Sequence, residues 1–213
     1  MITTFTMLKS SRLQLISLFV IWLITIFFLV TLNKVDLQII LNNINNGFLD
    51  FFFKYCTLLG SGWFALILIA VILVFINIRL SLLLTIANIT TGLFVQGLKK
   101  IIFEDSFRPA ALIKNLHFVQ GVDIHLYNSF PSGHTATAFA LFFALSLLTQ
   151  SLLAKWFFFI LALLIGYSRI YLSQHFLIDV LVGSIIGTFF FLLTFWLFGS
   201  KWEKWNHPLL SSV

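Results

Sequence analysis

The sequence predicts an all-α polytopic membrane protein, folded as a bundle of six transmembrane helices. Of its 213 residues, 60% are hydrophobic and only 9% are charged, whereas soluble domains carry about 25% charged residues. The apolar residues also run in continuous stretches, and a helix needs about 20 such residues to cross the ~30 Å core of a bilayer. Membrane strands would instead alternate in polarity over about ten residues. Helices are therefore the expected element throughout.

Six apolar stretches are long enough to be the expected spans. In chain order they are Leu13–Leu32, Trp63–Ile78, Leu80–Leu98, Gly133–Ser151, Trp156–Tyr171 and Phe176–Gly199. The first follows Lys9 and Arg12 as a signal peptide would, but it is longer than a usual apolar signal region and lacks a convincing cleavage site, so we expect a retained span. We expect a short interfacial helix within residues 33–62, and residues 104–131 form the longest polar loop. No repeat or linker divides the chain, which predicts a single domain over residues 1–213.

The balance of charge is positive, with 13 Lys and Arg residues against 7 Asp and Glu. Without a basic run, this excess does not indicate nucleic acid; in a membrane protein it sets topology or meets anionic lipid headgroups. Six spans put both termini on one side, together with six cations: Lys9, Arg12, Arg79, Lys155, Lys201 and Lys204. The opposite side has seven cations. Three of these, both arginines and one of Lys99 and Lys100, are assigned to phosphate binding below, so four remain to set topology. This difference predicts cytoplasmic termini. We expect the membrane to be the inner (plasma) membrane of a bacterium.

Polar residues gather in three clusters, all expected on the side opposite the termini. The second cluster in the chain is Pro131-Ser132-Gly133-His134, at the head of an apolar helix. Helix N-termini bind phosphate through free N–H groups, Ser132 suits an N-cap, and Gly133 permits close approach of a ligand. His134 can then deliver a proton. The alternative is an ordinary capped helix with a surface histidine.

The third cluster contains His175 and Asp179, four residues apart. This spacing puts both side chains on one helix face, so the carboxylate can hold one imidazole nitrogen and leave the other as a nucleophile or base. The alternative is a buried polar pair that joins two helices. Function is favoured because ionisable groups at membrane helices are costly and usually functional.

Arg108 and Arg169 are expected to bind phosphate, because one guanidinium group can donate two parallel hydrogen bonds to phosphate oxygens. The alternative for each arginine is contact with lipid headgroups at the interface. A lysine is also expected, and either Lys99 or Lys100 could serve. We favour Lys99, because it continues the polar stripe of the third span, which should turn into the bundle: Asn88, Gly92 and Gln96.

In order and spacing these clusters resemble the type 2 phosphatidic acid phosphatase superfamily, membrane lipid phosphatases related to vanadium haloperoxidases. The family pattern is a lysine before Arg-Pro, then Pro-Ser-Gly-His, then Ser-Arg with a histidine six residues after the arginine and an aspartate four later. Residues 99–179 supply Arg108-Pro109, Pro131–His134, Ser168-Arg169, His175 and Asp179. One departure is the lysine. The common pattern leaves six residues before Arg-Pro, but eight follow Lys99 and seven follow Lys100, so a local bulge or longer turn is expected.

The resemblance implies a phosphatase that works through a phosphohistidine, without metal or cofactor. His175 would attack phosphorus, Asp179 would orient its ring, and His134 would protonate the leaving oxygen. The phosphate oxygens would be held by Lys99, Arg108, Ser132, Gly133 and Arg169. The implied substrate is a membrane lipid phosphate or diphosphate; polyprenyl diphosphate, phosphatidylglycerol phosphate, phosphatidic acid and lipid A fit equally well. A lipid phosphotransferase and a non-catalytic lipid-phosphate binder or transporter stay open as alternatives, as does the oligomeric state.

Overall fold

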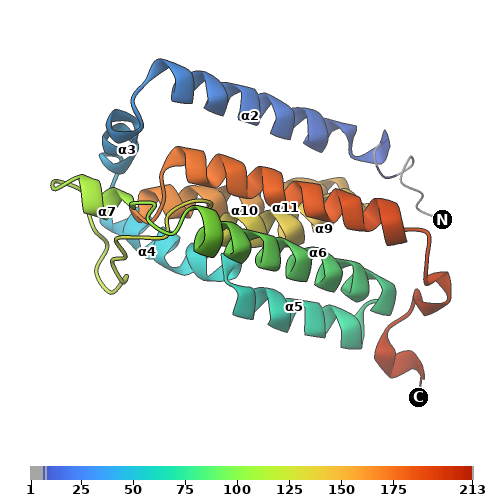
Figure 1. Cartoon of the computed structure of the whole chain (residues 1–213). Helices are drawn as coiled ribbons and strands as arrows, with labels where there is room; N and C mark the ends of the chain where they lie inside the picture. Colours follow the sequence, from blue (N-terminus) through green and yellow to red (C-terminus); the bar gives the residue numbers. More distant parts are fainter. Residues whose placement is uncertain (1–6, 8, 213) are drawn as a thin grey trace.

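The computed structural model describes residue 7 and residues 9–212, and within these the chain is helical with no strand. The longer helices run side by side as a bundle (Figure 1). Their bounds are α2 Arg12–Thr31, α3 Lys34–Asn42, α4 Gly47–Cys56, α5 Gly62–Phe75, α6 Ile78–Gly97, α7 Pro109–Leu112, α8 Gly133–Ala138, α9 Ala144–Leu148, α10 Leu152–Tyr171 and α11 Leu177–Phe198. Two π-helical turns, Leu98–Ile102 and Phe139–Phe143, extend α6 and join α8 to α9.

Four helices are long and apolar enough to cross a membrane: α2, α6 with its π turn, α10 and α11. A fifth span forms if the segments Gly47–Gly60 and Gly62–Phe75 count as one, although they are bent by 62°. The fourth expected span, Gly133–Ser151, corresponds to the segment Gly133–Leu148, which is apolar but shorter than the others. The all-α membrane bundle is therefore confirmed, and the number six stays a prediction.

Several expected helix bounds are wrong, and capping side chains explain the observed ones. Asn77 accepts the N–H of Leu80, so Ile78 begins α6 instead of ending the second span. Ser151 accepts the N–H of Ala154, so α10 begins at Leu152 and not at Trp156. An N-cap side chain satisfies an N–H that has no partner within the helix. Residues 33–62 hold α3 and α4 rather than one short helix, because Asn33 and Asn46 each cap a start.

The core of the bundle lies around α8, the following π turn and α9. Phe139, Leu141 and Phe143 are at most 1% exposed. Helix α11 packs against α8 so closely that a Cβ on Gly187 would lie 2.2 Å from the carbonyl oxygen of Ala136, and one on Gly183 would lie 2.6 Å from that of Ser132. These two glycines therefore let the backbones touch, which fixes the start of α8 against α11.

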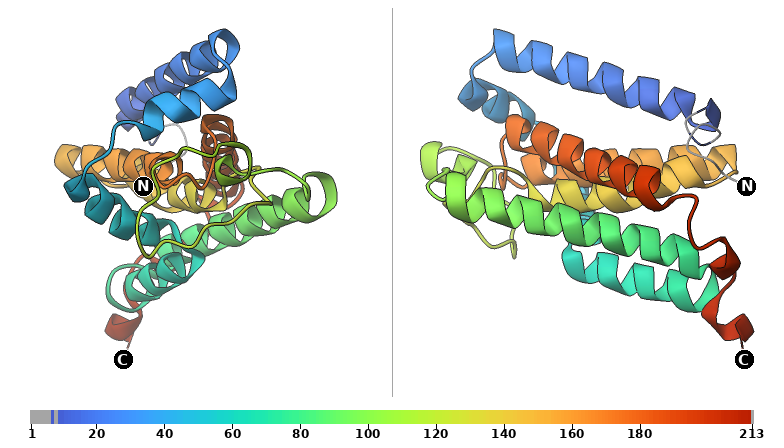
Figure 2. Two further views of the ribbon diagram at one scale, coloured as in Figure 1. Left: turned by 90° about the vertical axis from the view of Figure 1, so that its left-hand side faces the viewer. Right: turned by 45° about the vertical axis from the view of Figure 1, so that its right-hand side comes forward.

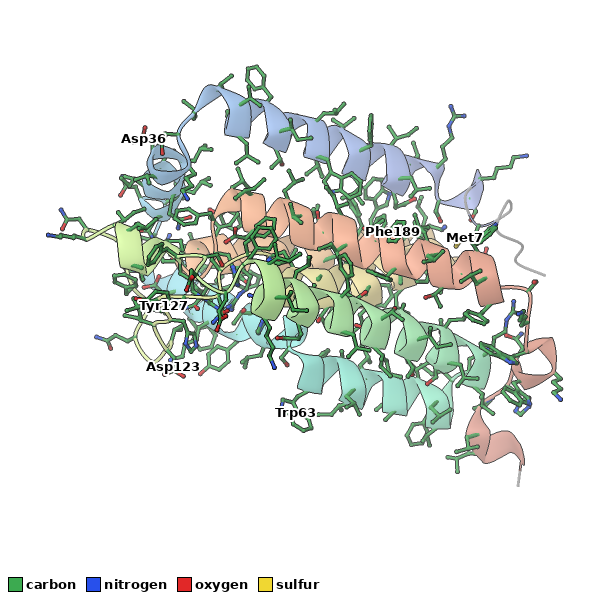
Figure 3. The ribbon with its side chains drawn as sticks, in the orientation of Figure 1. Met7, Asp36, Trp63, Asp123, Tyr127 and Phe189 are labelled. Atoms are coloured by element: carbon green, nitrogen blue, oxygen red, sulfur yellow. The ribbon has the colours of Figure 1, made fainter. Side chains whose placement is uncertain are left out.

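The two ends of the bundle differ. Helices α3 and α7 lie at one end with the loop between α6 and α8, and the start of α2 and the C-terminal turn lie at the other (Figure 1). Seen end-on, this loop lies across the bundle (Figure 2, left). The side chains of Asp36, Asp123 and Tyr127 mark the loop end, and Met7 marks the opposite end (Figure 3). The polar clusters of the sequence meet at the loop end.

Candidate active site

A cavity of about 380 Å³ opens at the loop end of the bundle. Six of the eight predicted site residues line it: Lys99, Arg108, Gly133, His134, Arg169 and His175. The other two, Ser132 and Asp179, are buried and hydrogen-bonded to residues of the site. We call this space the phosphate cavity. It brings together side chains that are 76 positions apart in the sequence, from Lys99 to His175.

His175 and Asp179 form the pair that the sequence predicts. The imidazole Nδ1 lies 3.3 Å from Asp179 Oδ2. The same oxygen accepts the N–H of Phe176 at 3.0 Å and the hydroxyl of Ser129. With Nδ1 directed at the carboxylate, Nε2 is the nitrogen left for the phosphate cavity.

The surroundings of His175 favour its neutral form. Burial, and then the positive charges of Arg169 and Arg108, hold the pKa of His175 well below its usual value. Both effects disfavour the imidazolium form. A neutral ring with its Nδ1 proton donated to Asp179 has a free lone pair on Nε2, which is what a nucleophile needs.

His134 lies at the start of α8, where the capping network is dense. Ser132 accepts the hydroxyl of Thr135 at 2.9 Å and the N–H of Thr135 at 3.4 Å. The N–H of Ser132 donates to the carbonyl of Asp179 at 3.0 Å, which joins α8 to α11. A Cβ on Gly133 would meet only Val95, at 3.8 Å, so it would project toward the open phosphate cavity. His134 is thus held beside the space that a phosphate would fill.

The arginines are fixed by different neighbours. Arg169, 7% exposed in the last turn of α10, donates from Nη1 to Thr57 at 2.6 Å. Arg108 donates from Nε to the carbonyl of Tyr127 at 2.8 Å and from Nη1 to the side chain of Gln174 at 2.8 Å. Burial lowers the pKa of Arg108, but a guanidinium keeps its charge in proteins. Both side chains are therefore preorganised cations facing one cavity.

Lys99 and Lys100 lie in the π turn that ends α6. Lys99 is buried at 9% exposure, and its Nζ donates to the carbonyl of Asn128 and, at 3.4 Å, to that of Ser129. Lys100 is exposed, although it also borders the phosphate cavity. A π turn accommodates an extra residue in a helix, so it provides the local bulge expected between the lysine and Arg-Pro.

The polar stripe expected on the third span does not turn toward the site as one face. Gln96 borders the phosphate cavity but is exposed. Asn88 and Gly92 instead line a separate, mostly apolar groove of about 420 Å³ between α5 and α6. The π turn changes the direction of the side chains that follow it, so a regular spacing of 100° per residue does not extend to Lys99.

Sequence reasoning missed the polar residues that hold the site together. Ser129 binds Asp179, Gln174 binds Arg108, and the carbonyl of Asn128 binds Lys99. Ser129 and Gln174 lie next to the Pro-Ser-Gly-His and histidine motifs, so their position beside a motif was an available signal. Thr57, which binds Arg169, lies 112 residues away from it and has no such signal.

The comparisons with known proteins point to one family. The sequence model of the PAP2 superfamily matches residues 77–203. An undecaprenyl-diphosphatase BcrC of Bacillus subtilis is 32% identical over 69% of this chain and 76% of its own length. A bacitracin transport permease protein BcrC of Bacillus licheniformis is 31% identical, over 43% of each chain. The chain thus spans less than half the length of that relative.

Two solved structures have a similar fold. LpxE of Aquifex aeolicus superimposes with a TM-score of 0.66 and 32% identity, over 75% of this chain and 92% of its own. A PAP2 type phosphatidylglycerolphosphate phosphatase of Bacillus subtilis superimposes with a TM-score of 0.64 and 25% identity, over 90% of this chain and 98% of its own. With the histidines, arginines and lysine around one cavity, these matches show that this chain belongs to the PAP2 superfamily and is a membrane phosphatase.

Proposed function

We propose that this protein removes the terminal phosphate of a lipid diphosphate or lipid phosphate through a phosphohistidine on His175. The observation that carries the proposal is the arrangement of two histidines on one cavity: His175 with Nδ1 on Asp179, and His134 at the start of α8. Lys99, Arg108 and Arg169 border the same space. Three cations suit the three non-bridging oxygens of a phosphoryl group, on which charge is spread in the transition state.

The reaction has two steps. In the first, Nε2 of His175 bonds to phosphorus, the bond from phosphorus to the leaving oxygen breaks, and His134 gives that oxygen a proton. Asp179 stabilises the positive charge that His175 acquires. In the second, a water molecule attacks the phosphohistidine, with His134 now accepting a proton from it, and the phosphorus–nitrogen bond breaks. The fixed cations act by preorganised electrostatic stabilisation.

The proposed substrate is a polyprenyl diphosphate. The undecaprenyl-diphosphatase similarity over most of both chains supports this choice. Phosphatidylglycerol phosphate, phosphatidic acid and lipid A are further candidates, the first supported by the similar fold of the phosphatidylglycerolphosphate phosphatase. The phosphate cavity is lined in part by Arg108, His125 and Asn128 of the loop between α6 and α8. This loop lies at an end of the bundle (Figures 1 and 2), which is where a lipid headgroup lies in a membrane. We propose an inner-membrane enzyme with cytoplasmic termini and this end facing the periplasm or cell exterior.

A lipid phosphotransferase is the second candidate, because an alcohol could replace water in the second step. The half-buried His134 and the exposed rim of the phosphate cavity, with Lys100 and His125, leave room for either acceptor. A non-catalytic binder or transporter is less well supported, since binding alone does not require Asp179 to contact the imidazole of His175.

The test is phosphate release by the purified protein in detergent, with a panel of lipid phosphates and diphosphates and with EDTA present. We expect release from at least one lipid and its loss in His175→Ala. Adding glycerol or another alcohol and analysing the products separates hydrolysis from transfer. If the protein binds these lipids but releases phosphate from none of them, the phosphatase proposal is wrong and the protein is a lipid-phosphate binder.

A further inference from the structure

A second cavity of about 290 Å³ adjoins the phosphate cavity. The two have His125, His134 and Arg169 in common. His175 lines the first but not the second, whereas Lys54 and Gly121 line the second but not the first. Lys54 also borders a third cavity, of about 430 Å³, on the side of Asp50. His134 therefore stands at the boundary between the cavity of the proposed nucleophile and the second cavity.

The position of His134 between the two cavities determines where the leaving group of the proposed reaction goes. In phosphoryl transfer the attacking and leaving atoms lie roughly in line, on opposite sides of phosphorus. If His175 attacks from one side, the leaving oxygen lies on the side of His134, the proposed acid. Whatever group that oxygen carries then enters the second cavity.

The second cavity has a cation of its own in Lys54, from α4. Its Nζ donates to the backbone carbonyl of Gln120 at 2.7 Å, and within the described part of the chain it makes no ion pair. Gly121 has a φ of +70°, and a Cβ there would lie 2.6 Å from Nζ. Glycine at this position lets the loop close over the ammonium group. Among the described residues this carbonyl is the one hydrogen-bond partner of Nζ, so the other N–H groups of the ammonium can donate to an anion.

Arg169, which lines both cavities, also has an unpaired hydrogen-bond donor in the part of the structure that is described. Its side chain is 7% exposed, and its Nε is buried with no hydrogen-bond partner among the described residues. Buried N–H groups are nearly always paired, so an orphaned one needs an explanation. Asp123, the one carboxylate among the residues that line this cavity, is exposed and lies at the outer edge of the loop (Figure 3).

We propose that the second cavity binds the phosphate that stays on the lipid when a lipid diphosphate is cleaved, with Lys54, Arg169 and His125 as its ligands. The inference rests on the proposed function and narrows its substrate class to diphosphates. His175 forms a bond to the terminal phosphorus, and the bond from that phosphorus to the bridging oxygen breaks. The electron pair remains on the bridging oxygen, which takes the proton of His134, and a lipid monophosphate leaves. Water then cleaves the phosphohistidine and releases phosphate.

The test is calorimetric binding of two probes to the full-length protein in detergent: inorganic phosphate and methylenediphosphonate, a diphosphate mimic whose P–C–P linkage is not hydrolysed. We expect the wild type to bind the diphosphonate at least tenfold more tightly than phosphate. Lys54→Met should weaken the diphosphonate about tenfold, as expected for loss of one charge-assisted hydrogen bond, and phosphate less than threefold. Lys54→Arg should restore the preference. Lys114→Met, an exposed lysine of the loop between α7 and α8 that borders neither cavity, is the control and should behave as wild type.

Equal affinity of the wild type for both probes would overturn the second subsite. So would a Lys54→Met variant that weakens both probes alike, because Lys54 would then only hold the loop. Hydrolysis is measured in parallel on a lipid diphosphate. A diphosphonate preference without any hydrolysis would reject the proposed function and keep the subsite, so the two failures are distinguishable.

Discussion

The hydroxyl of Ser129 donates to Asp179 Oδ2, the same carboxylate oxygen that faces His175 Nδ1. Ser129 is 1% exposed, so this hydrogen bond is shielded from water. The N–H of Phe176 reaches that oxygen as well, at 3.0 Å. The carboxylate is therefore held in place from two directions before it contacts the imidazole, which makes Ser129 a positioning residue for the proposed nucleophile.

Ser129→Ala should lower kcat about tenfold and change KM less than twofold. A hydrogen bond to a charged group contributes about 1.5–3 kcal/mol, and here the loss falls on the orientation of His175 rather than on lipid binding. Steady-state kinetics on the preferred lipid give the two constants. Ser146→Ala is the control, since Ser146 is equally buried but bonds to Phe143 in the core. A fall of the same size in that control would mean that buried serines matter only for folding.

The low pKa of His175 predicts an unusual acid limb in the pH profile. Because burial and neighbouring cations hold this pKa well below the ordinary value of about 6.5, His175 stays neutral and nucleophilic as the pH falls through 6.5. The acid limb of kcat/KM should then follow the ionisation of the substrate phosphate. Two lipids whose phosphate groups have different pKa values should show limbs that differ accordingly. A limb fixed near pH 6.5 for both lipids would mean that His175 titrates normally.

Lys99 and Lys100 give a matched pair of variants in one π turn. Lys99→Met should lower kcat/KM by about ten- to a hundredfold, because it removes a buried cation from the phosphate cavity. Lys100→Met should lower it less than threefold, since Lys100 is exposed and screened by water. Comparable losses in the two variants, or a larger loss at Lys100, would show that the lysine is assigned wrongly.

Substitution of Gly187 tests the contact between α11 and α8, and Gly92 in α6 is the control position. Gly187→Ala should lower the free energy of unfolding by about 1–3 kcal/mol or more, because the added Cβ would lie 2.2 Å from a backbone oxygen. Gly92→Ala should be neutral or stabilising, since nothing lies within 4 Å of the position that its added methyl group would take and alanine favours a helix by up to about 1 kcal/mol over glycine. Thermal unfolding in detergent measures both. Equal stability of the two variants would contradict the close packing.

The sequence predicts the long helices, and it predicts that the motif residues meet at one place, because both depend on local patterns. Apolar stretches identify the long helices, and six of the eight predicted residues line one cavity. What it does not predict depends on contacts between distant segments or on irregular backbone. The bend between α4 and α5 and the π turn at Lys99 break the regular periods. Thr57 reaches Arg169 only because the chain folds back.

The most direct test is to trap the covalent intermediate. The enzyme is mixed with a lipid diphosphate labelled with ³²P at its terminal phosphate, quenched in alkali within milliseconds and digested for peptide mapping. We predict a label that is stable to base, labile to acid, located on His175 and absent in His175→Ala. Label on another residue, or turnover without any labelled protein, would contradict the phosphohistidine mechanism.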